Sequence, residues 1–157
     1  MDQERLRKLR RSVTKAVISE RKSLKRVRAD VFSLLGNTAK GIDEDGGLQD
    51  AGNDLKTHSA KLQRLQKLSA EVGKASKRRA KVTEPMCYLE ASNTTDPDDV
   101  IRAYFVRNQA TVPGINFISP ESQIGEELYN PKRPEKTKRA GDVFTIAGGT
   151  YRITVVE

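Results

Sequence analysis

The chain has 157 residues and a net charge of +8, with 32% charged and 5% aromatic residues and no tryptophan, a composition that suits an elongated protein better than one thick core. Its one cysteine, Cys87, excludes an internal disulfide and a cysteine-based zinc cluster, and we expect it to be a core residue. No apolar run approaches the roughly 20 residues of a membrane-spanning helix, so we expect a soluble, cytoplasmic protein.

The spacing of apolar residues predicts one long helix over about residues 3–35. Apolar side chains recur at alternating steps of three and four residues, as in a coiled-coil seam, with one four-residue stutter. They are Leu6, Leu9, Val13 and Ala16, then Val17, Leu24, Val27, Val31 and Leu34. The opposite face is rich in lysine and arginine, which favours either an ordinary solvated face or contact with nucleic acid or an acidic partner.

A reversal follows, and then a second helix. Glycines at positions 36, 41, 46 and 47 supply the backbone freedom for a turn. Helical spacing returns with Leu48, Ala51, Leu55, His58, Leu62, Leu65, Leu68 and Val72. Two arms of about 30 residues reach roughly 45 Å and can pair antiparallel. We interpret His58 as a packing residue of this seam, because no cysteine or second histidine accompanies it.

The tip of this hairpin, over residues 36–50, is acidic. Asp43, Glu44 and Asp45 are adjacent, so they repel one another and add nothing to the packing of the arms. Electrostatic screening acts over about 8 Å at physiological salt, so basic residues halfway down the arms leave the tip negative. This pattern is typical of a solvated turn, or it places carboxylates beside a metal ion or a cationic surface of a partner.

The charge balance changes after the second arm. Residues 1–82 contain 21 Lys and Arg against 10 Asp and Glu, whereas residues 83–157 contain 8 against 11. We therefore predict two units, a hairpin over 1–80 and a second domain over 81–157. Basic residues at their junction suit a helix C-terminus and are candidate contacts for RNA or a partner. They are Lys74, Lys77, Arg78 and Arg79.

The second unit is predicted to be a small antiparallel β domain with one short helix, which makes the whole chain α+β. Short β-branched and aromatic runs over 86–90, 100–107, 112–118, 143–147 and 151–156 are separated by turn formers. Ser119-Pro120-Glu121 is expected to open the helix, with Ser119 as its cap and with Ile124 and Leu128 facing inward. The Pro-rich segment 130–138 is expected to be a mobile surface loop.

Four motifs of the second unit occur in an order that resembles a known family. They are Ser119-Pro120, Ile124-Gly125, Gly141-Asp142 and Tyr151-Arg152-Ile153. Together they resemble the C-terminal domain of bacterial Gre transcript cleavage factors, whose other half is a coiled-coil hairpin with an acidic tip. The resemblance therefore spans almost the whole chain and implies an FKBP-like fold for residues 81–157.

The resemblance implies a monomeric accessory factor of RNA polymerase rather than an enzyme. The coiled coil would enter the polymerase secondary channel, while the FKBP-like domain docks at its rim. In cleavage factors the tip carboxylates help the polymerase to hold a second Mg²⁺ and its water, and the 3′ end of backtracked RNA is hydrolysed. The corresponding acids here are Asp43, Glu44, Asp45 and Asp50. Mg²⁺ prefers such oxygen ligands, and two-metal hydrolysis requires an oriented water.

The chain departs from the family at the tip. Cleavage factors show a Gly-Asp-x-x-Glu-Asn run, whereas this chain has Gly46-Gly47-Leu48-Gln49-Asp50-Ala51. In one register Gly47 replaces the Asp and Asp50 the Glu; in another, Glu44 takes the Asp position and Gly47 the Glu position. Either way one carboxylate is missing, and the 43–45 cluster resembles the tips of inhibitory Gre homologues. We favour cleavage and keep inhibition as the alternative.

Two further classes of function stay open at this point. One is a non-catalytic coiled coil that binds DNA or RNA through its basic face, although no aromatic side chains interleave that face to stack on bases. The other is a prolyl isomerase, which the scarcity of aromatic residues for a proline pocket disfavours. A hinge near residues 81–85 could also change the orientation of the two units.

Overall fold

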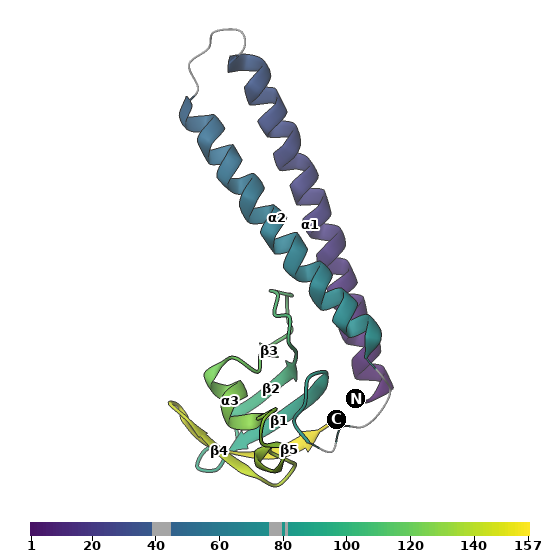
Figure 1. Cartoon of the computed structure of the whole chain (residues 1–157), viewed down its shortest axis with the longest axis vertical. Helices are drawn as coiled ribbons and strands as arrows, with labels where there is room; N and C mark the ends of the chain where they lie inside the picture. Colours follow the sequence, from purple (N-terminus) through teal and green to yellow (C-terminus); the bar gives the residue numbers. More distant parts are fainter. Residues whose placement is uncertain (39–44, 76–79, 81) are drawn as a thin grey trace.

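The computed structural model describes residues 1–38, 45–75, 80 and 82–157. A long helical hairpin, α1 (Gln3–Thr38) and α2 (Asp45–Lys74), stands on a small domain built from one sheet and one short helix (Figure 1). This arrangement confirms the predicted α+β class and the order of the two parts. Among the described residues, no helix has the length and apolar character needed to cross a membrane.

The two arms are longer than the sequence predicts. The helix α1 continues to Thr38, and α2 already begins at Asp45. The expectation that Gly46 and Gly47 form the turn is therefore wrong, because both lie in the first turn of α2. Pairing of the arms offsets the low helix propensity of these glycines: a Cβ built on Gly47 would lie 3.9 Å from Cδ2 of Leu34 on the opposite arm.

Packing along the hairpin is tightest at its base. The basal seam residues are each at most 3% exposed: Leu6, Leu9, Val13, Leu65, Leu68 and Val72. Farther out, seam residues such as Val27, Val31, Leu48 and Leu55 are only half-buried. The apolar contribution to stability therefore falls from the base toward the tip, since it scales with the area removed from water.

The sheet has the strand order β3-β2-β1-β5-β4. Its strands are β1 (Cys87–Asn93), β2 (Val100–Phe105), β3 (Phe117–Ile118), β4 (Val143–Ile146) and β5 (Gly149–Val156). All pairs are antiparallel except β2 and β3, which run parallel, so the sheet is mixed rather than wholly antiparallel. The predicted strand over 112–118 is reduced to Phe117–Ile118, because Gly114, at φ 71°, turns the chain between Val112 and Ile115.

The short helix α3 (Gln123–Leu128) has a different cap from the one expected. Ser122 Oγ accepts a hydrogen bond from the Gly125 N–H at 3.1 Å and donates to the Ser119 carbonyl at 2.7 Å. Ser122 is therefore the N-cap, and Ser119 belongs to the turn before it. Leu128 is fully buried and Ile124 packs beside the same core, as predicted.

The Pro-rich segment over 130–138 is largely exposed, as expected of a surface loop, and it contains a short 3-10 helix, η1 (Pro134–Lys136). Its far end is fastened to the domain. The Lys138 N–H donates to the Leu128 carbonyl at 2.9 Å, and the Lys138 carbonyl accepts from the Thr83 N–H at 2.9 Å. Thr83 Oγ1 also donates to the Leu128 carbonyl. Cys87 is fully buried, as predicted, and burial raises the pKa of its thiol to about 12.

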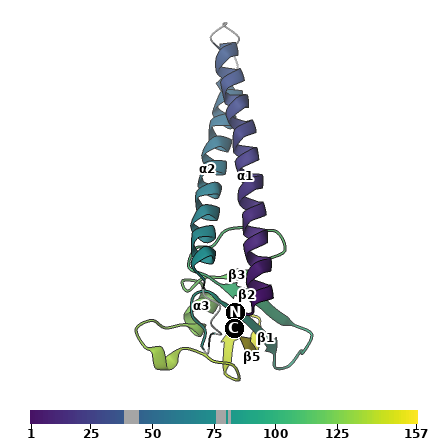
Figure 2. The same ribbon diagram turned by 90° about the vertical axis from the view of Figure 1, so that its right-hand side faces the viewer.

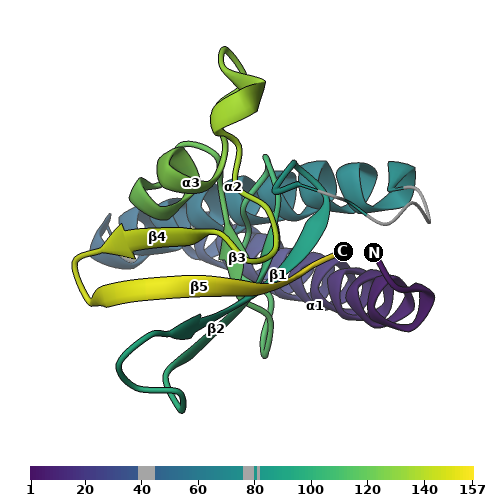
Figure 3. The ribbon, with the colours of Figure 1, turned by 90° about the horizontal axis from the view of Figure 1, so that it is seen from below.

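The hairpin and the sheet share one apolar core. Tyr88, Tyr104, Val106 and Val112 of the β domain pack in the same cluster as the basal seam residues of the hairpin. The two chain ends lie side by side at this junction in views from three directions (Figures 1, 2 and 3). A second core, which contains Phe105 with Leu89, Leu128 and Ile153, belongs to the β domain alone.

A glycine substitution tests the fit of α3 against its preceding turn. A Cβ on Gly125 would lie 1.8 Å from the Ser119 carbonyl oxygen, whereas a Cβ on Gly52 within α2 would meet nothing within 4 Å. We expect Gly125→Ala to lower the free energy of unfolding by about 3 kcal/mol or more. Gly52→Ala should instead raise it by about 0.5–1 kcal/mol. Denaturant unfolding of both variants measures the difference, and equal effects would contradict the packing described for α3.

Candidate functional site

The predicted site residues lie at the far end of the hairpin and at its base. Asp45 is the first residue of α2, where a negative charge favours the helix dipole, and Asp50 is exposed on the same helix. Lys74 is the exposed last residue of α2. The remaining predicted residues lie outside the described part of the chain: Asp43, Glu44, Lys77, Arg78 and Arg79.

Asp45 and Asp50 occupy different faces of α2. Positions five residues apart in a helix differ by about 140° around the axis and about 7.5 Å along it. In the parts of the chain that the structure describes, no group of three or more His, Cys, Asp or Glu is arranged to hold a metal ion.

The two arms of the outer hairpin differ in charge. On α1, exposed cations follow one another between residues 21 and 28: Arg21, Lys22, Lys25, Arg26 and Arg28. The stretch of α2 nearest the tip, residues 45–55, contains three aspartates and no lysine or arginine, whereas the rest of α2 contains five cations and one glutamate. The predicted basic face is thus confirmed on α1, and the acidic stretch of α2 is confined to its outer end.

Sequence reasoning missed a group of exposed apolar side chains on α1. Ile18, Phe32 and Leu35 are 49%, 73% and 46% exposed. Together with Arg21, Lys25 and Arg28 they recur at steps of three and four residues, so they form one stripe beside the seam. The signal is visible in the sequence as a second heptad series offset from the buried one.

Sequence reasoning also missed Glu20, which is 5% exposed at a seam position of α1. Its Oε1 lies 2.5 Å from His58 Nδ1, and its Oε2 lies 3.1 Å from Lys61 Nζ (side chains from α2). Burial raises the pKa of Glu20, but hydrogen bonds from His58 and Lys61 outweigh it, so the net pKa lies below the ordinary value. The half-buried His58 is thus a seam residue as predicted, and its polar partner is Glu20.

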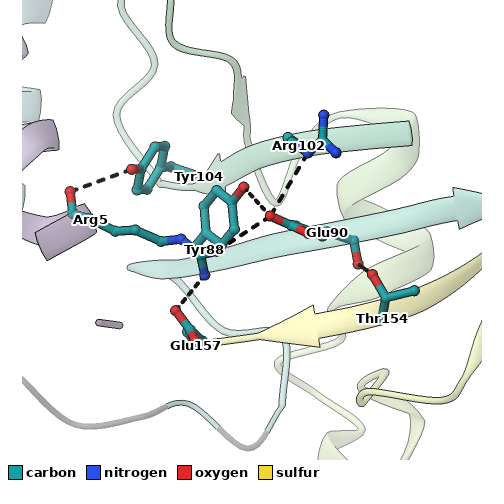
Figure 4. Close-up of polar contacts among 7 residues, drawn as sticks. All are labelled: Arg5, Tyr88, Glu90, Arg102, Tyr104, Thr154 and Glu157. Atoms are coloured by element: carbon teal, nitrogen blue, oxygen red, sulfur yellow. Dashed lines mark hydrogen bonds and ion pairs between the residues drawn. The ribbon is translucent and has the colours of Figure 1, made fainter. Parts of the chain in front are cut away.

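At the base, Arg5 joins α1 to the sheet (Figure 4). Its guanidinium donates to Glu157 Oε2 at 2.6 Å and to Glu90 Oε1 at 3.4 Å. The guanidinium carbon, Cζ, lies 4.1 Å from the centre of the Tyr88 ring. The Tyr88 hydroxyl donates to Glu90 at 2.6 Å, and the Tyr104 hydroxyl donates to the Arg5 carbonyl at 3.4 Å. Burial and the hydrogen bond to Glu90 raise the pKa of Tyr88 to about 12.

A second polar tie fastens α2 to the β domain. Both carboxylate oxygens of Glu71 accept hydrogen bonds, one from the Arg107 N–H at 2.8 Å and the other from the Asn108 N–H at 2.9 Å and Asn108 Nδ2 at 2.8 Å. On the other arm, Arg10 donates to the carbonyls of Val72 and Gly73 in the last turn of α2 and of Ala75 just after it, which ties the two arms together at the base. These ties and the shared core fix the orientation of the hairpin on the domain.

Comparison with known proteins gives matches among solved structures. The chain is similar to the GreA factor homolog 1 (Gfh1) protein of Thermus thermophilus, with 18% identity over 94% of each chain and a TM-score of 0.38. A structure described as the transcription factor Gfh1 gives 16% identity over 94% of this chain and 92% of that chain, with a TM-score of 0.40. Gfh1 of Thermus aquaticus gives 19% identity, 92% and 90% coverage, and a TM-score of 0.39.

The first of these proteins is described as a homologue of GreA factor. No protein-family model matches the chain. No curated protein matches it either.

Replacing Glu71 tests the tie between α2 and the β domain. Glu71→Gln keeps the size of the side chain but turns an amide NH₂ toward backbone N–H donors, so at least one donor loses its acceptor. We expect the free energy of unfolding to fall by about 1–3 kcal/mol. The matched substitution Glu127→Gln, at an exposed position of α3, should change it by less than about 0.5 kcal/mol. Similar values for the two variants would show that the tie adds nothing to stability.

Proposed function

We propose that the chain is a Gre-type factor that inserts its hairpin into the secondary channel of a bacterial RNA polymerase in the cytoplasm. In this role it stimulates Mg²⁺-dependent cleavage of backtracked nascent RNA. The observation that carries the proposal is the placement of acidic residues at the far end of a long paired hairpin. The Gre-like motifs of the second half support it, because they lie on the domain from which that hairpin projects.

The polymerase supplies the chemistry in this proposal, and the chain completes its site. Mg²⁺ is six-coordinate, keeps several waters, and accepts one or two added carboxylates readily. The carboxyl groups of Asp43, Glu44 and Asp45 are of the required type. A metal held jointly with the polymerase would supply an oriented water and stabilise the leaving oxygen. The chain's own contribution would be to carry negative charge to the RNA 3′ end, with Asp50 as a further candidate acid on α2.

The elongated shape of the hairpin fits this delivery role. A long antiparallel pair of helices is narrow, because its only apolar layer lies between two helices whose diameters are about 10–12 Å each. The outer ends of α1 and α2 therefore lie far from the β domain without a bulky support (Figure 2). The β domain would remain at the channel entrance as the docking part, together with the basic junction residues Lys74, Lys77, Arg78 and Arg79.

Inhibition of RNA synthesis is the second candidate function. It is favoured by a specific departure, since Gly47 stands where cleavage factors carry one of two carboxylates. In that case the tip occupies the channel and blocks nucleotide entry or holds the metal unproductively. The two functions share the same binding site on polymerase and differ only in whether the bound metal activates water.

The decisive experiment uses purified bacterial polymerase halted in a backtracked complex with end-labelled RNA and Mg²⁺. We expect the full chain to shorten the RNA from its 3′ end. Replacing Asp43, Glu44 and Asp45 together by Ala should abolish cleavage while helicity by circular dichroism stays unchanged, because these side chains add no packing. The control variant Glu126→Gln/Glu127→Gln removes two exposed charges from the β domain and should cleave normally.

The other outcomes assign the alternatives. Slower elongation without shortened RNA would establish the inhibitory function. Absence of any effect on polymerase, together with binding to free DNA that falls steeply with salt and ignores the tip substitutions, would replace the proposal by a nucleic-acid-binding coiled coil.

A further inference from the structure

We propose that Glu20, together with His58 and Lys61, is a positioning group that fixes the register of the two hairpin arms and thereby the height of the acidic tip. The part of this inference that concerns the tip rests on the proposed function. The part that concerns register does not, because it follows from burial and geometry within the hairpin.

The first argument is the burial of an ionisable side chain in an apolar seam. The Glu20 side chain is 6% exposed, and both of its oxygens have partners on the other arm, His58 Nδ1 at 2.5 Å and Lys61 Nζ at 3.1 Å. A buried carboxylate without such partners is strongly disfavoured. The hairpin therefore satisfies Glu20 only when residue 20 lies opposite residues 58 and 61.

The second argument is the position of this group along the hairpin. On the side of the β domain, Val13 and Leu65 are each 1% exposed and belong to the shared core. On the side of the tip, Leu24 is still buried, and beyond it seam residues such as Val27 and Leu55 are half-buried. Glu20 and Leu24 are thus the outermost buried seam residues among the described part of α1, near the point where tight packing gives way to loose packing.

Loose aliphatic seams specify register weakly. A shift of one arm by three or four residues replaces one small apolar side chain by another and keeps the same face inward. A polar residue at a seam position removes this freedom, because the shift would leave it buried without its partner; a single such residue is known to set register in coiled coils at a cost in stability. Here Glu20 is the polar seam residue, and His58 is its partner on the opposite, antiparallel arm.

A change of register would displace the tip by more than a metal site can tolerate. A slip of one helical turn moves an arm by about 5 Å, whereas Mg²⁺ holds its oxygen ligands at about 2.1 Å. A tip whose two arms are out of register would present its carboxylates at the wrong height or angle. Glu20 therefore acts on the tip through the arms and touches neither metal nor RNA.

Spin-label distances between the outer arms measure register directly. Labels on Lys15→Cys and Gln49→Cys, both exposed positions on opposite arms, are well separated along the hairpin axis, so a slip of one arm changes the distance between them by nearly the length of the slip. Cys87 can stay in place, since it is fully buried and its thiol pKa of about 12 leaves it unreactive toward the label. The native pair should give one narrow distance by pulsed electron resonance.

Three variants in this labelled background separate register from mere stability. Glu20→Leu/His58→Leu fills the seam with apolar groups, so its Tm should not fall, but its distance should broaden or shift by about 5 Å. Exchanging the partners in Glu20→His/His58→Glu keeps the pair, with Lys61 one turn from the new glutamate, and should restore the narrow distance. Arg21→Leu, at the exposed neighbouring position, should leave the distance unchanged.

An unchanged narrow distance in the double leucine variant would overturn the inference, as would an exchange variant no narrower than the double leucine variant. RNA cleavage assayed on the same proteins should fall about tenfold or more when register is lost and recover in the exchange variant. The label distances could behave as expected while neither the native chain nor any variant acts on polymerase. That result would refute the proposed function and leave the register assignment standing.

Discussion

The whole molecule depends on the apolar contact between the base of the hairpin and the sheet. Leu68 and Leu9 of the hairpin are fully buried in a cluster that includes Tyr88 and Tyr104 of the β domain. A lever about 45 Å long that tilts by about 5° displaces its end by about 4 Å, so small movements at the base become large ones at the tip. The ties made by Arg5 and Glu71 flank this core and restrain such a tilt.

Burial of the seam decreases along the hairpin from its base outward. The base is held by side chains removed from water, whereas most seam residues of the outer part are only half-buried. A two-helix structure has room for only one apolar layer, so a thin outer hairpin cannot have a thick core. Polar contacts such as that of Glu20 with His58 then supply the specificity that dense packing supplies at the base.

The sequence allowed the hairpin and the strands to be predicted, because both follow from local spacing of apolar residues. It did not allow the partner of Glu20 to be identified, since pairing between residues 38 positions apart depends on how two whole arms align. The cap of α3 was also predicted wrongly: the sequence favoured Ser119 because Pro120 follows it, whereas in the structure the Gly125 N–H donates to Ser122 Oγ. The glycines at 46 and 47 indicate a turn by propensity, but pairing of the arms extends the helix through them.

The course of α2 also bears on which carboxylates can serve a metal together. In the Gre-like motif an acid pair three residues apart lies on one helix face. Here that pair would be Gly47 and Asp50 in one register and Glu44 and Gly47 in the other, so one member has no carboxylate in either register. The two functions proposed above would therefore differ in whether the motif's one remaining carboxylate is enough to hold a metal productively.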